Sequence, residues 1–179
     1  MPTFYDRFVE CAERWPQNVA LEIQLPDGIE GHTYAELRRI AESIAAWLVN
    51  RGVQPGARVA ILAENHPRWV AAYLGIIAAG GATVPLDTAY HSDQVAKLLR
   101  DSAASLMFCD LKHLEVAQEA VAELNVELVL TTEVHPYDLL RYERAIFSRS
   151  AIEKLQESLK KTVSKRRLAA SQATQAEVA

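Results

Sequence analysis

Four short apolar runs alternate with helical patterns between residues 33 and 131, and this order restricts the fold more than any other feature of the sequence. The first run, 58–63, is apolar on both faces, which is typical of a strand that helices cover on its two sides. The other runs lie at 82–86, 105–109 and 126–130, and we expect the strand at 82–86 to be buried as well. Strands separated by helices pair in parallel through right-handed crossovers. The sequence therefore predicts an α/β fold with a layered, incomplete parallel sheet.

The segment before residue 33 predicts a helix followed by a hairpin. A short amphipathic helix is expected over 3–15, and Trp15-Pro16 ends it because a residue that precedes proline disfavours the helical conformation. Strands are expected at 19–25 and 29–33, joined by a turn at Pro26-Asp27-Gly28.

Capping residues mark the helix boundaries after residue 33. Thr33 and Glu36 have the spacing of a capping box, and Gly52 follows the same helix at a position where a left-handed residue often ends one. The next helix is apolar almost all round, so we expect it in the interior, and Gly80-Gly81 ends it. The other predicted N-caps are Asn65 or His66, followed by Pro67, and Ser92 or Asp93.

A change of composition divides the chain near residues 132–137. Gly81 is the last of seven glycines, and residues 137–179 hold nine Lys/Arg against five Asp/Glu, although the whole chain has a formal net charge of −4. Helical spacing over 138–167 predicts a long, weakly amphipathic helix, followed by a polar and disordered tail. We therefore divide the chain into a subdomain at 1–131 and a basic helical tail at 132–179.

Several features bear on the compartment and on macromolecular partners. The acidic net charge argues against a nucleic-acid partner, and the basic residues at 160–167 lack interleaved aromatics, so we interpret them as a solvated helix face. The longest apolar stretch, 69–81, is too short to span a membrane, and the first residues lack the pattern of a signal peptide. Cys11 and Cys109 show no metal-ligand or CxxC spacing. These features predict a cytoplasmic protein without a membrane span.

Few residues are candidates for a functional site. Asn65-His66-Pro67 follows a strand at the edge where open α/β sheets bind ligands, but helix capping explains all three residues. Asp87 is a carboxylate at another strand end, and we favour a turn-capping role over a functional acid. The other histidines have no metal-ligand spacing and are expected to be solvated or capping: His32, His91, His113 and His135. The sequence therefore assigns no catalytic, cofactor-binding or metal-binding residue.

Five segments in order carry a family resemblance. They are Thr33-Tyr34-Ala35-Glu36-Leu37, the runs PGARVAIL at 55–62, NHPRWVAAYLG at 65–75 and AAGGATVPLD at 78–87, and VAKLLRDS at 95–102. Together they resemble the first subdomain of the AMP-forming acyl-CoA synthetase family, the adenylate-forming enzymes that include fatty-acyl-CoA ligases. The resemblance covers residues 3–131.

The resemblance implies ATP-dependent activation of a carboxylic acid, here a fatty acid, to an acyl-adenylate and then transfer of the acyl group to coenzyme A. It implies ATP, Mg²⁺ and coenzyme A as cofactors of a complete member, because Mg²⁺ and backbone N–H groups neutralise phosphate charge. The family's Ser/Thr/Gly-rich phosphate loop ending in Pro-Lys-Gly, and its C-terminal subdomain with the catalytic lysine, have no match here. No family site residue is therefore carried over, and the chain alone is expected to bind no cofactor and to be inactive.

Three interpretations stay open. We favour an N-terminal fragment of such a ligase, separated from the nucleotide-binding half by a truncation or a frameshift. A second interpretation is a non-catalytic interaction module that docks a partner through the helix at 138–167. A third is one half of a split ligase, completed by a second polypeptide. In each case the exposed edge of an incomplete sheet is expected to favour self-association.

Overall fold

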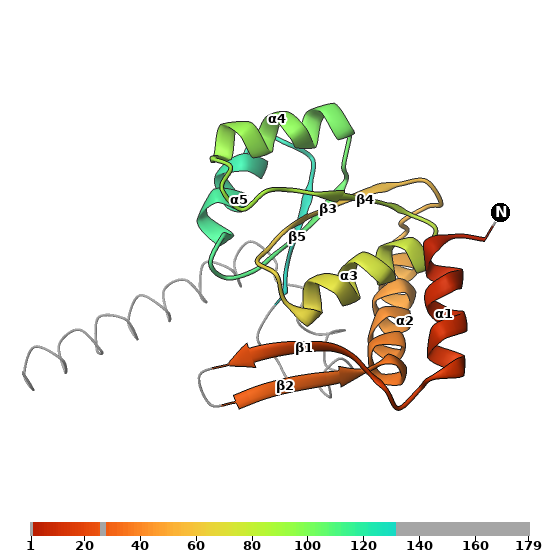
Figure 1. Ribbon diagram of the computed structural model, residues 1–179. Helices are drawn as coiled ribbons and strands as arrows, with labels where there is room; N and C mark the ends of the chain where they lie inside the picture. Colours follow the sequence, from red (N-terminus) through yellow and green to blue (C-terminus); the bar gives the residue numbers. More distant parts are fainter. Residues whose placement is uncertain (1, 26–27, 132–179) are drawn as a thin grey trace, which may run out of the picture. The chain divides into compact units, whose positions relative to one another are not determined.

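The computed structural model describes residues 2–25 and 28–131, and from residue 33 onward its helices and strands alternate as predicted (Figure 1). These residues belong to the first of two units, Met1–Glu143 and Arg144–Ala179, so the predicted helix at 138–167 lies outside the described residues. The helices are α1 (Phe4–Arg14), α2 (Tyr34–Asn50), α3 (Pro67–Ala78), α4 (Ser92–Ser102) and α5 (Leu114–Val121). The strands are β1 (Val19–Leu25), β2 (Gly28–Thr33), β3 (Arg58–Leu62), β4 (Ala82–Pro85), β5 (Leu106–Cys109) and β6 (Glu127–Leu130).

Four of these strands form one parallel sheet, which confirms the expected α/β class. Its order is β4-β3-β5-β6, with Val59 in register with both Thr83 and Leu106. The chain leaves β3 for β4 on one side and then crosses back to β5 on the other side. Strands β1 and β2 form a separate antiparallel pair, as the turn at 26–28 predicted.

The inner strands are buried on both faces because they are apolar from Val59 to Leu62 in β3 and from Leu106 to Cys109 in β5. Val59 and Ile61 of β3 form one core with Phe108 of β5, and this core also contains Leu48 of α2 and residues of α3. The alternate residues of the two inner strands are equally buried: Ala60, Leu62, Met107 and Cys109. Figure 1 shows α4 and α5 on the side of the sheet away from α2 and α3, so both faces are covered.

Local signals set most of the element boundaries. Thr33 Oγ1 accepts a hydrogen bond from the Glu36 N–H at 3.2 Å, and the Glu36 carboxylate accepts from the Thr33 N–H, so the predicted capping box is confirmed. Gly52 has a left-handed φ of 82° just after α2. Two details were predicted wrongly. Helix α4 begins at Ser92 with His91 as its N-cap residue, because the Gln94 side chain accepts from the His91 N–H. Strand β4 is half exposed rather than buried, because it lies at the end of the strand order.

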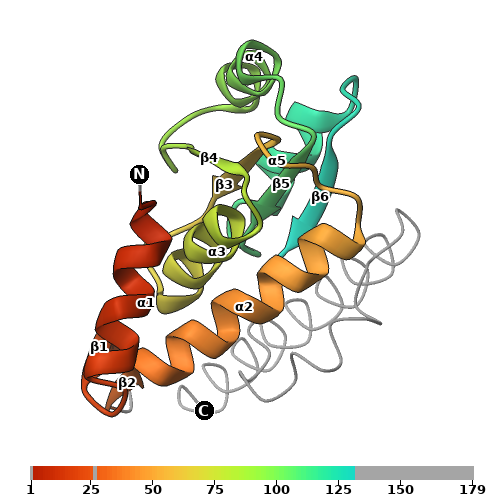
Figure 2. The ribbon, with the colours of Figure 1, turned by 90° about the vertical axis from the view of Figure 1, so that its right-hand side faces the viewer.

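Helix α3 packs closely on α2. A Cβ placed on Gly75 would lie 2.6 Å from Ile44 Cγ2, so the absence of a side chain lets the two helices approach. Figure 2 shows α1, α3 and α2 side by side, with α2 running away from α1 toward β6. No helix in the described residues is long and apolar enough to cross a membrane.

Candidate functional site: the carboxyl edge of the sheet

The carboxyl ends of β3 and β5 meet at the point where the strand order reverses. In open α/β sheets this crevice is the usual place for a ligand. Here Glu64 follows β3, and Asp110, Lys112 and His113 follow β5. We call these four residues the switch-point cluster. The sequence analysis missed Glu64, Asp110 and Lys112, although polar residues after two apolar strands were a signal that could have found them.

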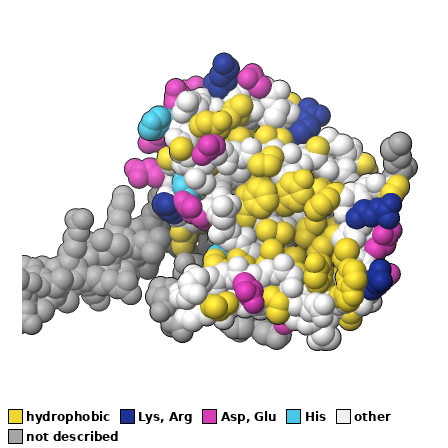
Figure 3. Space-filling model, in the orientation of Figure 1, with side chains coloured by type: hydrophobic (Ala, Val, Ile, Leu, Met, Phe, Trp, Pro, Cys, Tyr) yellow, Lys and Arg dark blue, Asp and Glu magenta, His cyan; other side chains and the backbone are white. Residues whose placement is uncertain are grey.

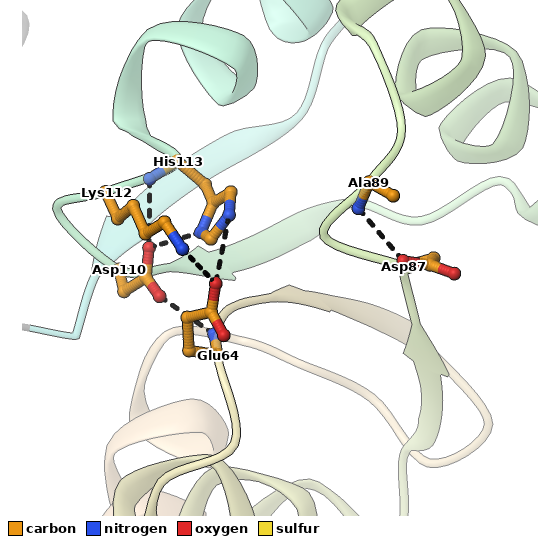
Figure 4. Close-up of polar contacts among 6 residues, drawn as sticks. All are labelled: Glu64, Asp87, Ala89, Asp110, Lys112 and His113. Atoms are coloured by element: carbon orange, nitrogen blue, oxygen red, sulfur yellow. Dashed lines mark hydrogen bonds and ion pairs between the residues drawn. The ribbon is translucent and has the colours of Figure 1, made fainter.

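The carboxylate of Asp110 is the centre of the switch-point cluster (Figure 4). Its Oδ2 accepts a hydrogen bond from the Glu64 N–H at 2.8 Å, and its Oδ1 accepts from the His113 N–H at 2.9 Å. The His113 ring nitrogen Nδ1 lies 2.7 Å from the same Oδ1. The Glu64 carboxylate in turn accepts from Lys112 Nζ. Asp110 therefore ties the loop after β3 to the loop after β5.

These hydrogen bonds decide the charge state of Asp110. Burial by itself raises the pKa of its carboxyl group, but the hydrogen bonds from Glu64 N–H and from His113 outweigh burial and hold the pKa below its ordinary value of 3.8. The carboxylate is therefore charged at neutral pH, with its two oxygens already committed to donors of the protein.

The two site candidates from the sequence have capping roles, as the sequence analysis favoured. His66 is the N-cap of α3, and its Nδ1 accepts a hydrogen bond from the Arg68 N–H at 3.1 Å. Asn65 is exposed and Pro67 is the first residue of the helix. Asp87 accepts from the Ala89 N–H at 2.9 Å and turns away from the switch-point cluster, as Figure 4 shows.

The expectation for the other histidines was partly wrong. The side chain of His113 is only 9% exposed and contacts Asp110, although the residue stands before the first turn of α5. His32 is also buried, and its Nε2 lies 3.0 Å from a Glu30 carboxylate oxygen. Both differ from a solvated histidine because tertiary packing encloses them. His91 is exposed, and His135 lies outside the described residues.

The carboxyl edge does not fit the phosphates of ATP. The carboxylates of Glu64, Asp87 and Asp110 would repel a triphosphate, and the one lysine of the switch-point cluster is paired with Glu64. The loops after β3 and β5 also lack the glycines that let backbone N–H groups enclose phosphate oxygens. Within residues 2–25 and 28–131, no group of three His, Cys, Asp or Glu side chains could hold a metal ion.

Two residues with nucleophilic side chains, Cys109 and Thr131, end or follow strands at this edge. Thr131, which follows β6, donates its hydroxyl to the Cys109 carbonyl oxygen at 3.1 Å. Burial raises the pKa of the Cys109 thiol to about 12, so this cysteine is not a thiolate nucleophile at neutral pH. The hydrogen bonds of Asp110 join the two loops, and neither Thr131 nor Cys109 is an activated nucleophile.

The fold and this edge define a layered α/β unit in which Asp110 joins the two loops at the switch point of the sheet. The family to which the unit belongs is shown by sequence comparison. The family model of the AMP-binding enzymes matches residues 8–174, so the chain belongs to the AMP-binding family of adenylate-forming enzymes.

Individual relatives match different lengths of the chain. Tyrocidine synthase 3 of Brevibacillus parabrevis is 35% identical over 132 residues, which cover 74% of this chain and 2% of that protein. The large ribosomal subunit protein uL4 of Acidobacterium capsulatum is 87% identical over 45 residues, which cover 25% of this chain and 20% of that protein. The chain therefore spans a small part of the length of both curated relatives.

A solved structure shows the same fold. A benzoate CoA ligase from Burkholderia xenovorans superposes with a TM-score of 0.67 and is 21% identical. The match covers 76% of this chain and 27% of that chain. At this identity the likeness establishes the fold alone.

Proposed function

We propose that this chain supplies the N-terminal α/β unit of an adenylate-forming ligase. The observation that carries the proposal is the family match over residues 8–174, and the fold shared with a benzoate CoA ligase supports it. The complete enzyme would convert a carboxylate and ATP to an acyl-adenylate and pyrophosphate, and then pass the acyl group to the thiol of coenzyme A. Mg²⁺ would stabilise the phosphate charge. The described residues act as a support and bind no phosphate.

In this proposal the carboxylic acid substrate is not restricted to fatty acids. The relatives include a benzoate CoA ligase and a tyrocidine synthase, whose names point to acids of different kinds. A fatty acid, as the sequence resemblance implied, is one candidate among three classes, with aryl acids and amino acids as the others.

The test starts from an affinity-tagged full chain, purified from the cell that makes it together with the polypeptides that stay bound to it. This assembly is then assayed for ATP–pyrophosphate exchange. Exchange that depends on one acid class supports the proposal and names the class. Lack of exchange with fatty, aryl and amino acids contradicts it. Exchange by the full chain purified without any partner would show that the chain itself completes the site.

The free thiols of Cys11 and Cys109 favour a reducing compartment. We therefore propose a cytoplasmic location for the protein. Immunofluorescence or fractionation of the source cell tests this, and recovery of the chain from an oxidising compartment would contradict it.

A second candidate function rests on the likeness to the ribosomal protein. We infer that the 45-residue match falls within residues 132–179, because the composition changes at 132–137 and the remaining segment is long enough to hold it. That segment is basic, in contrast to the rest of the chain. We therefore infer that this basic segment associates with the large ribosomal subunit. This candidate function differs from the expectation, drawn from the acidic net charge of the whole chain, that the protein has no nucleic-acid partner.

Co-sedimentation with purified large ribosomal subunits tests the second candidate. Replacing Arg166 and Arg167 with alanine should weaken co-sedimentation at low salt, because each lost cation removes a phosphate contact. The control variant carries Lys97→Ala and Arg100→Ala, two exposed positions of α4, and should sediment like the wild type. If no full chain sediments with the subunits, this function is excluded. Long reads of genomic DNA across codons 120–150 check independently that both parts are encoded together.

A further inference from the structure

The imidazole ring of His113 lies between two carboxylates that come from different loops (Figure 4). Its Nδ1 lies 2.7 Å from Asp110 Oδ1, and its Nε2 lies 3.8 Å from Glu64 Oε1. Asp110 stands in the loop after β5, and Glu64 stands in the loop after β3. The buried ring therefore spans the two loops of the switch point.

Asp110 fixes the position of one ring proton. Its pKa is held below 3.8 although burial raises it, so near neutral pH the carboxylate only accepts hydrogen bonds. The ring nitrogen Nδ1 must then carry hydrogen to bond Asp110 Oδ1. In a neutral ring the other nitrogen, Nε2, has no hydrogen and is itself an acceptor. It faces the Glu64 carboxylate, so a neutral His113 ring cannot bind Glu64.

A second proton on the ring changes this contact. Histidine is the side chain that ordinarily changes charge between about pH 5 and 8. With hydrogen on Nε2 as well, the ring is a cation with one donor directed at each carboxylate, and hydrogen bonds between charged groups are stronger than neutral ones. The Glu64 side chain is half exposed, so it has room to move the short distance from 3.8 Å to hydrogen-bond distance.

Glu64 has a competing partner, which gives the contact two arrangements. The same oxygen, Oε1, accepts from Lys112 Nζ. Lys112 is mostly exposed, and an ion pair in such a place contributes little because water screens it. Glu115, in the first turn of α5, is exposed, and Asp87 after β4 turns away from the ring. The charge on His113 therefore decides whether Glu64 pairs with an exposed cation or with a buried one.

We propose that the switch-point cluster is a latch operated by a proton. When His113 takes a proton from water, Glu64 leaves Lys112 for the ring nitrogen Nε2, and the ring fastens the loop after β3 to the loop after β5. When the proton is lost, the hydrogen bond from the Glu64 N–H to Asp110 still joins the loops, but the side-chain contact is gone. The loop after β3 leads into α3, so the start of this helix is held more tightly in mild acid than in mild base. The latch does not depend on the proposed function.

Nuclear magnetic resonance of the full chain, labelled with ¹⁵N, follows the ring and the loop between about pH 5 and 8.5. The ring signals of His113 are those that disappear in His113→Gln. As the ring loses its proton, the protection of the Glu64 amide against hydrogen exchange, corrected for the ordinary pH dependence of exchange, should fall about threefold, which is within the range of a partly exposed ion pair. The control is the Gly56 N–H, which donates to the Gly80 carbonyl oxygen at 2.8 Å and should keep its protection. A ring that does not titrate in this range overturns the latch, and so does a Glu64 amide whose protection does not follow the ring.

Two substitutions at exposed side chains give a second readout, which a purely structural role would not move. Glu64→Gln removes the negative partner of the ring, so the midpoint of the ring titration should move to lower pH by about half a pH unit. Lys112→Gln removes the competing cation and should move the midpoint to higher pH. The control is Glu119→Gln, at an exposed position one turn further along α5, which should leave the midpoint within about 0.1 pH unit at about 0.15 M salt. Midpoints that stay in place, or that move in the same direction in both variants, contradict the latch.

Discussion

Asp110 carries the clearest consequence at the scale of single residues. Its two oxygens face the N–H groups of Glu64 and His113 and the His113 ring nitrogen. In Asp110→Asn one oxygen becomes an amide group that cannot accept, so a donor loses its partner. We expect a loss of about 1–3 kcal/mol in the free energy of unfolding, measured with urea at neutral pH. Asp101→Asn, at an exposed position of α4, is the control and should stay within about 0.5 kcal/mol of the wild type.

The same residue predicts a pH dependence. The pKa of Asp110 lies below 3.8 in the folded protein, because hydrogen bonds outweigh the effect of burial. Its contribution to stability is therefore present above the unfolded pKa and is lost as the pH falls through the folded pKa. Unfolding at about pH 6, 4 and 3 should show a steeper loss of stability for the wild type than for Asp110→Asn. Parallel profiles would show that Asp110 has the same pKa in both states.

Ala103 is strained at the end of α4. It has a left-handed backbone with a φ of 51° and a ψ of 39°, which brings its Cβ close to the backbone. Ala103→Gly removes that contact, although the added freedom of the unfolded chain reduces the gain. We expect a rise of about 0.5–1 kcal/mol in the free energy of unfolding, read from thermal unfolding. A lower melting temperature would mean that the strain is absent in solution.

At the scale of elements, the contact between α2 and α3 depends on Gly75. A Cβ at this position would lie 2.6 Å from Ile44 Cγ2 and 3.0 Å from the Ala41 carbonyl oxygen. In Gly75→Ala the overlap should cost about 1–3 kcal/mol and exceed the roughly 1 kcal/mol that alanine gains in a helix. Chemical denaturation measures the difference. In an Ile44→Ala background the same change should cost less, and a purely additive double-mutant cycle would contradict direct contact.

The elements show why local signals predict some boundaries and miss others. The Thr33 cap, the break at Trp15-Pro16 and the end of α2 before Gly52 depend on residues close in sequence, so they could be predicted. The exposure of β4 could not, because an apolar run does not show whether its strand is central or at an edge. The burial of His113 could not be predicted either, because it depends on the tertiary contact between Asp110 and the loop after β3.

At the scale of the whole molecule, the two edges of the described sheet differ in their capacity to add a strand. On β4, the N–H groups of Ala82 and Leu86 donate toward β3. The backbone nitrogens of Thr83 and Pro85 therefore point toward the open edge, and Pro85 has no N–H to donate there. On β6, the N–H groups of Glu127 and Thr131 donate toward β5. The backbone N–H groups of Leu128 and Leu130 therefore point away from β5, toward the open edge.

We expect self-association of the full chain to use β6. Leu128→Pro removes one outward donor and should shift sedimentation velocity profiles toward monomer, because proline blocks the addition of a strand. Thr83→Pro is the matched control on β4 and should leave the profile unchanged. A wild-type chain that stays monomeric at high concentration would contradict this expectation, as would equal effects of the two variants.

The whole chain is also expected to bind no ATP when purified alone. Its carboxyl edge carries three carboxylates, and Asp110 joins the two loops around the crevice. Isothermal titration calorimetry with ATP and Mg²⁺ should show no binding in the micromolar range. A micromolar affinity would mean that phosphate-binding residues lie outside residues 2–131.

The sequence by itself determined the alternation of helices and strands, most of the caps and the family. Each of these depends on residue type and on short spacing, which the printed order of residues contains. Only the tertiary structure decided that β3 and β5 are neighbours, so that Asp110 accepts a hydrogen bond from the Glu64 N–H across 46 positions and joins the two loops at the switch point. It also decided that Gly75 faces Ile44. These contacts arise where crossovers bring distant segments together, and no local pattern encodes which segments will meet.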